Sequence, residues 1–249
     1  MAEMDPAPRP DALSVDDVSF RYGARKALDG VTFAVPRGRF CALLGPNGAG
    51  KSTLFALLTR LLVTDRGRIA VAGHDIARAP RAALSRIGVI FQQSTLDLDT
   101  TVVRNMRYFA ALHGLSGGEA ARRIDAALDR LDMRERAGER VRSLNGGHRR
   151  RMEIARALVH DPEVLLLDEP TVGLDAASRL SITRYVHELA EGGLTVLWAT
   201  HLVDEIAPSD DVVVLHRGQV LVQDRAEALA GAEGLTEAFM RLTGADAAA

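Results

Sequence analysis

Residues 45–52 have the types and spacing of a phosphate-binding loop. They fit the pattern G-x-x-x-x-G-K-[ST], in which glycines let successive backbone N–H groups curl around phosphates. A helix that begins after the loop adds its unpaired N–H groups. Lys51 would reach the β- and γ-phosphates, and the Ser52 hydroxyl would ligate Mg²⁺. A plain glycine-rich turn is the alternative, but a buried strand before the loop and helical spacing after it favour nucleotide binding. The candidate residues are Gly45, Pro46, Asn47, Gly48, Ala49, Gly50, Lys51 and Ser52.

A second candidate is the acidic pair Asp168-Glu169, which follows the apolar run at residues 164–167. A carboxylate at the C-terminal end of a parallel strand lies at the ligand-binding edge of the sheet. Asp168 would hold Mg²⁺ through water, and Glu169 would polarise the attacking water as a general base. Strands often end in acids, so this pattern gains weight only beside the phosphate loop. Together the two elements predict that a bound phosphate, a metal ion and a general base lie at one edge of the sheet.

The surrounding elements are predicted from their apolar periodicity. Strands alternate with helices, which predicts a mainly parallel α/β sheet with a helical insertion over about residues 98–159. Residues 12–244 would form one domain, the chain beyond residue 225 reads as helical, and residues 245–249 would fray. The predicted strands are residues 12–20, 30–35, 39–44, 164–167, 195–199, 212–215 and 219–222, with a β-rich stretch at 67–90. The predicted helices are residues 51–62, 104–112, 119–131 and 176–190.

Composition excludes several classes of protein. The 249 residues are 47% apolar and 26% charged, which is a globular balance. A net charge of −2 argues against a dedicated duplex-DNA binder. The single cysteine, Cys41, excludes an internal disulfide and fits a reducing cytosol. No apolar run approaches the roughly 20 residues of a membrane-spanning helix. Residues 1–11 lack the apolar stretch of a secretory signal and are expected to form a disordered tail.

With these elements in place, the sequence resembles the ATP-binding subunits of ABC transporters from about residue 13 to residue 244. The resemblance rests on several motifs in the order that the family shows. They are the phosphate loop extended to Thr53, Phe91-Gln92 as the glutamine loop, Leu144-Asn145-Gly146-Gly147-His148 as the signature segment, Asp168-Glu169-Pro170-Thr171, Gly173-Leu174-Asp175 as the aspartate loop, and Thr200-His201 as the histidine loop.

The resemblance implies roles for four further residues. Tyr22 would stack on adenine, although it also fits a half-buried strand aromatic. Gln92 would ligate Mg²⁺ and sense the membrane partner, with a polar strand end as the alternative. His201 would bond the γ-phosphate and position the catalytic water, whereas a lone histidine is usually structural. Asp175 would reach across a dimer interface, and it also suits the N-cap of the next helix.

The signature segment departs from the family's Ser-Gly-Gly-Gln. Asn145, Gly146 and Gly147 would still offer an amide donor, backbone N–H groups and a helix N-terminus to the nucleotide of an opposing subunit. Asn145 would also still cap that helix. His148 introduces a titratable group. The three arginines at residues 149–151 are compatible with a solvated helix face, and the sequence leaves their role open.

Another segment, Leu115-Ser116-Gly117-Gly118-Glu119, matches the signature letters better. Its distance from Asp168 is too long for the family, and Ser116 with Glu119 suits a capping box at the start of a helix. The signature is therefore assigned to residues 144–148.

The expected protein is an α/β P-loop NTPase with a mainly parallel core sheet, an antiparallel β subdomain and an inserted helical subdomain. By resemblance it is an ATP hydrolase that uses ATP and Mg²⁺, with Lys51, Glu169 and His201 as catalytic residues. Its partners would be an integral membrane permease, of exporter type, and a second ATPase subunit, a homodimer being favoured. It would lie on the cytoplasmic face of the membrane without inserting, and would not bind nucleic acid. The alternatives are a soluble ABC ATPase outside transport, such as one for iron–sulfur assembly, and a weakly hydrolysing partner in a heterodimer.

Overall fold

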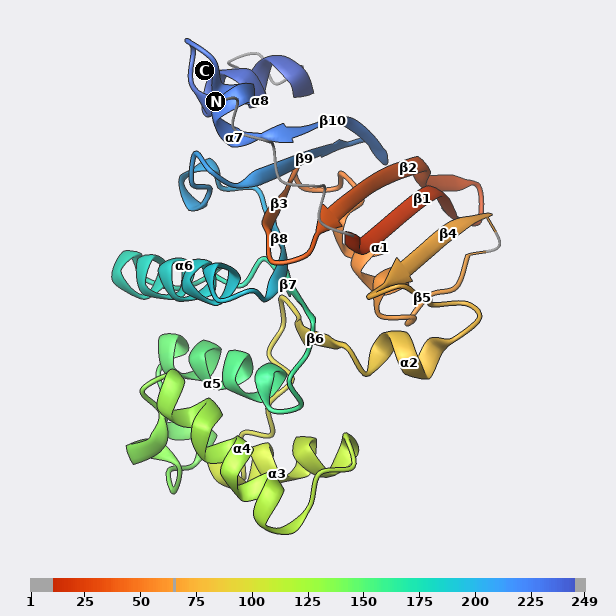
Figure 1. Ribbon diagram of the computed structural model, residues 1–249. Helices are drawn as coiled ribbons and strands as arrows, with labels where there is room; N and C mark the ends of the chain where they lie inside the picture. Colours follow the sequence, from red (N-terminus) through yellow and green to blue (C-terminus); the bar gives the residue numbers. More distant parts are fainter. Residues whose placement is uncertain (1–10, 65, 245–249) are drawn as a thin grey trace, which may run out of the picture.

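The computed structural model describes residues 11–64 and 66–244, and its centre is a six-stranded sheet (Figure 1). The strand order is β10-β9-β3-β8-β7-β6, and every neighbouring pair is parallel except β9 and β10. This confirms the mainly parallel sheet and the C-terminal hairpin predicted from the sequence. The strands are β3 (Phe40–Leu44), β6 (Ile87–Ile90), β7 (Val164–Asp168), β8 (Thr195–Thr200), β9 (Asp211–His216) and β10 (Gln219–Arg225).

The central strands are buried on both faces, as their continuous apolar runs predict. Successive side chains of β3 point to opposite faces, so Phe40 and Ala42 join one hydrophobic cluster while Cys41 and Leu43 join the other. One face is covered by α5 (Gly146–Leu158) and α6 (Ala176–Glu191), and α1 (Lys51–Leu58) covers the other. Helices on both faces thereby bury the central strands β3, β7 and β8.

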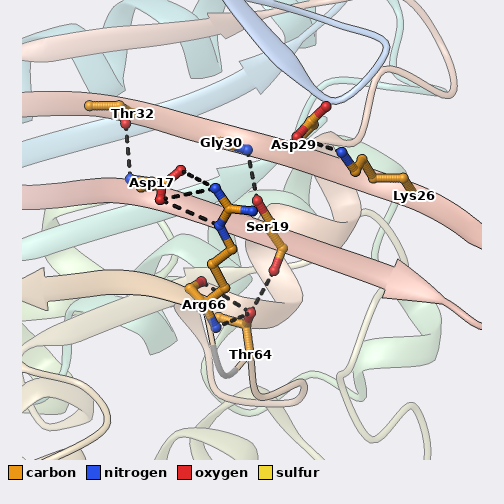
Figure 2. A network of polar contacts seen from close by, with 8 residues as sticks. All are labelled: Asp17, Ser19, Lys26, Asp29, Gly30, Thr32, Thr64 and Arg66. Carbon is orange, nitrogen blue, oxygen red and sulfur yellow. Dashed lines mark hydrogen bonds and ion pairs between the residues drawn. The ribbon is translucent and has the colours of Figure 1, made fainter.

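The second sheet is four-stranded and antiparallel, in the order β2-β1-β4-β5, and α1 lies between it and the central sheet (Figure 1). Figure 2 shows how side chains stabilise its irregular β1–β2 pairing. Asp17 has φ +45°, its N–H donates to the Thr32 hydroxyl at 2.9 Å, and the Gly30 N–H donates to Ser19 Oγ at 2.9 Å. The strands are β1 (Asp11–Tyr22), β2 (Arg25–Pro36), β4 (Arg66–Val71) and β5 (His74–Asp75).

Helices α3 (Val102–Leu112) and α4 (Gly117–Arg130) pack with α5 at one end of the molecule (Figure 1). They fall within the predicted helical insertion, together with the short 3₁₀ turns η1 (Arg134–Arg136) and η2 (Val141–Ser143). Ser116 is the N-cap of α4, but its side chain makes no capping hydrogen bond. The predicted capping box is therefore wrong, because the Ser116 hydrogen bond that defines it is not formed. Glu119 instead pairs with Arg123 at 3.0 Å.

Two other local predictions differ from the structure. The helix predicted to reach residue 62 ends at Leu58, and Leu61 beyond it is 69% exposed. The stretch at 67–90 contains a helix, α2 (Pro80–Leu84), which begins with proline at its first turn. Five residues are too few to show helical periodicity, so the sequence pattern did not reveal α2.

The chain after β10 forms α7 (Ala226–Ala230) and α8 (Leu235–Thr243), in agreement with the predicted helical tail. Asp11 already belongs to β1, while the rest of the predicted N-terminal tail and residues 245–249 lie outside the described residues. None of the helices in residues 11–64 and 66–244 combines the length and apolar character needed to cross a bilayer.

Candidate functional site

The phosphate-binding loop connects β3 to α1, as predicted. Gly48 and Gly50 have φ +80° and +113°, a region that side chains other than glycine rarely adopt. A Cβ atom on Gly50 would lie 2.8 Å from Leu28 Cδ2, and one on Gly45 would lie 2.4 Å from the Leu215 carbonyl oxygen. The glycines therefore permit both the backbone conformation of the loop and its close packing against β2 and β9.

The loop forms one wall of a pocket of about 470 Å³, which is within the usual range for a small-molecule site. Tyr22, Gln92 and Glu169 contribute to other walls, so the structure brings these predicted residues together from separate segments. Sequence reasoning missed four lining residues, because nothing in their local pattern marks them. These are Arg25, Lys26 and Ala27 at the start of β2 and Arg217 in the β9–β10 turn.

Glu169 is the point where several predicted residues meet. Its carboxylate lies 3.2 Å from Lys51 Nζ, 3.4 Å from His201 Nδ1 and 3.5 Å from Gln92 Nε2. Its backbone has φ +47°, which costs energy in a non-glycine residue and is held by its surroundings. The Glu169 N–H donates to the Ala199 carbonyl at 3.0 Å, which anchors the turn to β8.

Asp168 is buried at the end of β7, and its Oδ1 atom has no hydrogen-bond partner among the described residues. Burial and the neighbouring Glu169 charge raise the pKa of Asp168, while Lys51 and a hydrogen bond from Ser52 lower it. An unpartnered carboxylate oxygen beside a hydroxyl is the oxygen donor set that Mg²⁺ prefers. The residues present therefore fit the metal that the sequence predicts.

Tyr22 ends β1 and is 52% exposed at the mouth of the pocket. Its ring meets Phe20 edge-on at 5.0 Å between centroids, which leaves much of the phenol accessible. An exposed ring beside the phosphate loop is available for stacking on a base, while its place at the end of β1 also agrees with the alternative of a half-buried strand aromatic.

The signature and aspartate-loop residues lie together, and they do not line this pocket. Asn145 caps α5 by accepting from the His148 N–H at 2.8 Å, and Asp175 caps α6 by accepting from the Ser178 N–H at 2.9 Å. A Cβ atom on Gly147 would lie 2.7 Å from Ser178 Oγ, so the two helix N-termini pack closely. The capping roles of Asn145 and Asp175 are therefore confirmed.

The surroundings of His148 disfavour its charged form. Burial and the charges of Arg136 and Arg151 lower its pKa, against a smaller opposing effect of Glu139. The departure from glutamine at this position therefore leaves a group that is both hydrogen-bond donor and acceptor without adding a charge.

The structure shows the role of Arg150, one of the three arginines whose role the sequence left open. Arg150 is buried and pairs with Glu153 at 2.8 Å. Its guanidinium donates to the carbonyls of Phe91 at 3.0 Å and Gln92 at 3.2 Å. Arg150 is therefore not part of a solvated helix face. It is a buried residue that links α5 to the glutamine loop by hydrogen bonds.

Comparisons with known proteins show which family the chain is similar to. The sequence matches the ABC transporter family over residues 28–172. It is 41% identical over 224 residues to the daunorubicin resistance ATP-binding protein DrrA3 of Streptomyces coeruleorubidus, covering 90% of this chain and 71% of that protein. It is 37% identical over 218 residues to the Nod factor export ATP-binding protein I of Ralstonia nicotianae, covering 87% of this chain and 68% of that protein.

A solved structure of an ATP-binding subunit of an ABC transporter has the same fold. Its TM-score is 0.82 at 29% sequence identity, and the match covers 93% of this chain and 99% of that one. The alternative of a soluble ABC ATPase outside transport is not favoured, because these similar proteins are transport or resistance subunits by name. The phosphate loop, the acidic strand end and the fold agree, and the chain belongs to the ABC transporter family as an ATP-binding subunit.

Proposed function

We propose that this chain hydrolyses ATP to drive an exporter-type membrane permease. The observation that carries the proposal is the position of Glu169, whose buried carboxylate lies at the pocket wall within 3.5 Å of Lys51, His201 and Gln92 side-chain nitrogens. A general base must be held within reach of the water it activates and beside the groups that bind the phosphate. Glu169 lines the same pocket as the phosphate loop and lies beside Lys51, which supports its role as the base.

Different residues bind the nucleotide, hold the metal and activate water for phosphoryl transfer. Backbone N–H groups of the loop and the Lys51 ammonium bind the β- and γ-phosphates, and Tyr22 stacks on the adenine. Asp168, Ser52 and Gln92 would hold Mg²⁺, which neutralises charge that develops on the phosphate oxygens. Glu169 accepts the proton of the attacking water, and His201 orients that water and the γ-phosphate.

A second ATPase subunit completes the site. Asn145, Gly146 and Asp175 are exposed and stand apart from the chain's own pocket, although the family motif assigns them to the nucleotide. In a head-to-tail dimer, these residues of each copy would close over the phosphates bound by the other, and ATP would be sandwiched twice. We favour a homodimer, because the chain carries both halves of the site.

The exporter assignment rests on the names of similar proteins, a daunorubicin resistance protein and a Nod factor export protein. ABC ATP-binding subunits of this kind work with a membrane permease, which would place this chain at the cytoplasmic face of the membrane. Co-purification with a permease that depends on a solute-binding protein would contradict the export direction.

The test compares ATP turnover of the wild type with that of Glu169→Gln, both purified with the permease. Glu169→Gln keeps the shape and the hydrogen-bonding capacity but removes the base, so turnover should fall by about 100-fold or more. Purified without the permease, the variant should also accumulate as an ATP-bound dimer, measured by size-exclusion chromatography with light scattering. Glu188→Gln, an exposed change on α6, is the matched control and should keep wild-type turnover.

A wild type that hydrolyses ATP no faster than Glu169→Gln would contradict the proposal. That result would favour the alternative of a weakly hydrolysing partner in a heterodimer, which the Asn145 and His148 departures motivate. ATP binding without turnover, measured by calorimetry, would then separate this alternative from a chain that does not bind nucleotide.

A further inference from the structure

Glu205 is a buried carboxylate close to the site, and the sequence assigned it no role of its own. It ends the 3₁₀ turn η3 (Val203–Glu205) and is 5% exposed. Its Oε1 atom accepts from the Thr171 hydroxyl, and its Oε2 atom accepts from Trp198 Nε1 at 3.0 Å and Thr200 Oγ1 at 2.6 Å. A buried charge is costly unless it is satisfied in this way.

The directions of these hydrogen bonds follow from the chemistry of the partners. The Trp198 indole N–H only donates. The Thr200 hydroxyl accepts from the Leu202 N–H at 3.0 Å, so its own proton is free to point at Glu205. Glu205 therefore accepts all three hydrogen bonds. Hydrogen bonds to an ionised carboxylate are stronger than hydrogen bonds between neutral groups.

The partners of Glu205 adjoin the two residues that carry the proposed chemistry. Thr171 belongs to the turn that begins at Glu169, where the Val172 N–H donates to the Glu169 carbonyl at 3.3 Å. Thr200 directly precedes His201, and its carbonyl accepts from the Gly45 N–H at 3.2 Å. One carboxylate thus joins the turn after β7, the turn after β8 and, through Thr200, the first residue of the phosphate loop.

We infer that Glu205 is a positioning residue for hydrolysis, which sets the placement of Glu169 relative to His201. The inference rests on the proposed function. Glu169 has a left-handed backbone that its surroundings must enforce, and its turn is tied to the His201 turn by Glu205. Loss of this link would let the 3.4 Å separation between Glu169 and His201 relax. Catalysis is sensitive to such displacements, whereas the phosphate loop would still bind ATP.

The test is Glu205→Gln, because the amide has the same shape but replaces one carboxylate oxygen by an N–H₂ group, which then faces either the Thr171 hydroxyl or the Trp198 and Thr200 donors. Its matched control is Asp204→Asn, the adjacent exposed carboxylate, which pairs with Arg179 at 3.1 Å outside this network. We expect kcat to fall by about 10- to 100-fold in Glu205→Gln. The KM and the dissociation constant for ATP should stay near the wild-type values, and Asp204→Asn should match the wild type in all of them.

A second pair of variants serves if Glu205→Gln does not fold. Thr171→Val removes one donor and should lower kcat, while Thr171→Ser restores the hydroxyl and should recover it. Unchanged kcat in folded Glu205→Gln or in Thr171→Val would overturn the inference, as would an equal loss of turnover and ATP affinity. These results differ from failure of the proposed function, in which the wild type itself would show no turnover above Glu169→Gln.

Discussion

The Lys51 ammonium lies 3.2 Å from the Glu169 carboxylate, and both side chains are buried. Lys51 also donates to the Gly45 carbonyl at 2.6 Å, so its position is determined by the phosphate loop and by the end of β7 together. The cation that binds phosphate and the base that activates water are thus electrostatically linked. A change at either residue is expected to alter the environment of the other.

Lys51→Ala should lower both nucleotide affinity and stability. Removal of one partner leaves the other charge buried, which costs about 3–5 kcal/mol in unfolding free energy. The measurement is urea unfolding without nucleotide, in the wild-type and Glu169→Gln backgrounds. Lys51→Ala should cost less in the second background, because the uncompensated charge is absent there. Equal costs in both backgrounds would show that the pair is not energetically coupled.

The β9–β10 turn should prove important for the phosphate loop. The Gly218 N–H donates to the Ala49 carbonyl at 2.8 Å, and a Cβ atom on Gly218 would lie 2.6 Å from the Ala27 carbonyl oxygen. Gly73 has nearly the same φ, +80° against +79°, but open space around it, which makes Gly73→Ala the matched control. Gly73→Ala should lower the unfolding free energy by about 1–2 kcal/mol, because alanine is strained in this backbone conformation.

Gly218→Ala should lower the unfolding free energy by about 1–3 kcal/mol more than Gly73→Ala does, because the backbone of β2 must move away from the new Cβ atom. ATP affinity should fall with it, since Gly218 is bonded to the loop. Urea unfolding gives the first quantity and calorimetric titration with ATP the second. Equal stability of the two variants would contradict the packing argument.

His187 should stabilise the fold most strongly below neutral pH. Its Nδ1 lies 2.8 Å from the Thr183 carbonyl, its Nε2 lies 2.8 Å from Asp210 Oδ2, and both atoms face acceptors, so the imidazolium satisfies both bonds. Burial lowers the pKa of His187, but the bonds to Asp210 and Thr183 and the charges of Asp210 and Glu191 outweigh it and raise the pKa above 6.5. The ring also stacks on Phe40 at 4.0 Å, which favours the cation.

A raised pKa in the folded state means that the folded protein binds the proton more tightly than the unfolded chain. The stabilisation is fully present below about pH 6.5 and is lost as the pH rises through the raised value. The unfolding free energy of the wild type should therefore exceed that of His187→Gln by an amount that shrinks above pH 6.5. A difference that is constant from pH 6 to pH 9 would contradict the assignment.

His160 should have the opposite effect on stability to that of His187, because its pKa is lowered in the folded protein. Its Nε2 lies 3.0 Å from the Ile87 carbonyl, its Nδ1 has no partner within residues 11–64 and 66–244, and its ring stacks on His113 at 3.7 Å. Burial, followed by the His113 charge, lowers the pKa of His160 to about 4. The unfolded chain therefore takes up this proton first as the solution is acidified.

Stability linked to His160 is present above about pH 6.5 and is lost as the pH falls toward about 4. His160→Gln keeps a donor for the Ile87 carbonyl but does not titrate. Chemical denaturation between pH 4 and pH 7 should show a shallower acid loss of stability in this variant. A wild type and variant with parallel curves would refute the prediction.

Local chemistry made several parts of this protein predictable. The glycines of the phosphate loop, the burial of β3 on both faces and the N-caps at Asn145 and Asp175 depend on residues close in sequence, so pattern alone was sufficient. Prediction failed where the local signal was weak or ambiguous. The helix α2 is too short for periodicity, and the Ser116 cap had the right residue types without the hydrogen bond.

The sequence by itself determined the family, the parallel sheet and most of the residues at the nucleotide pocket, because its motifs encode short-range backbone geometry and strand ends that share one edge. Only the tertiary structure decided that Arg150 links α5 to the glutamine loop, that Arg217 reaches the pocket and that Glu205 joins the turns after β7 and β8. These roles depend on which distant segments pack together. A charged residue has the same appearance in sequence whether its partner is water or a buried carbonyl.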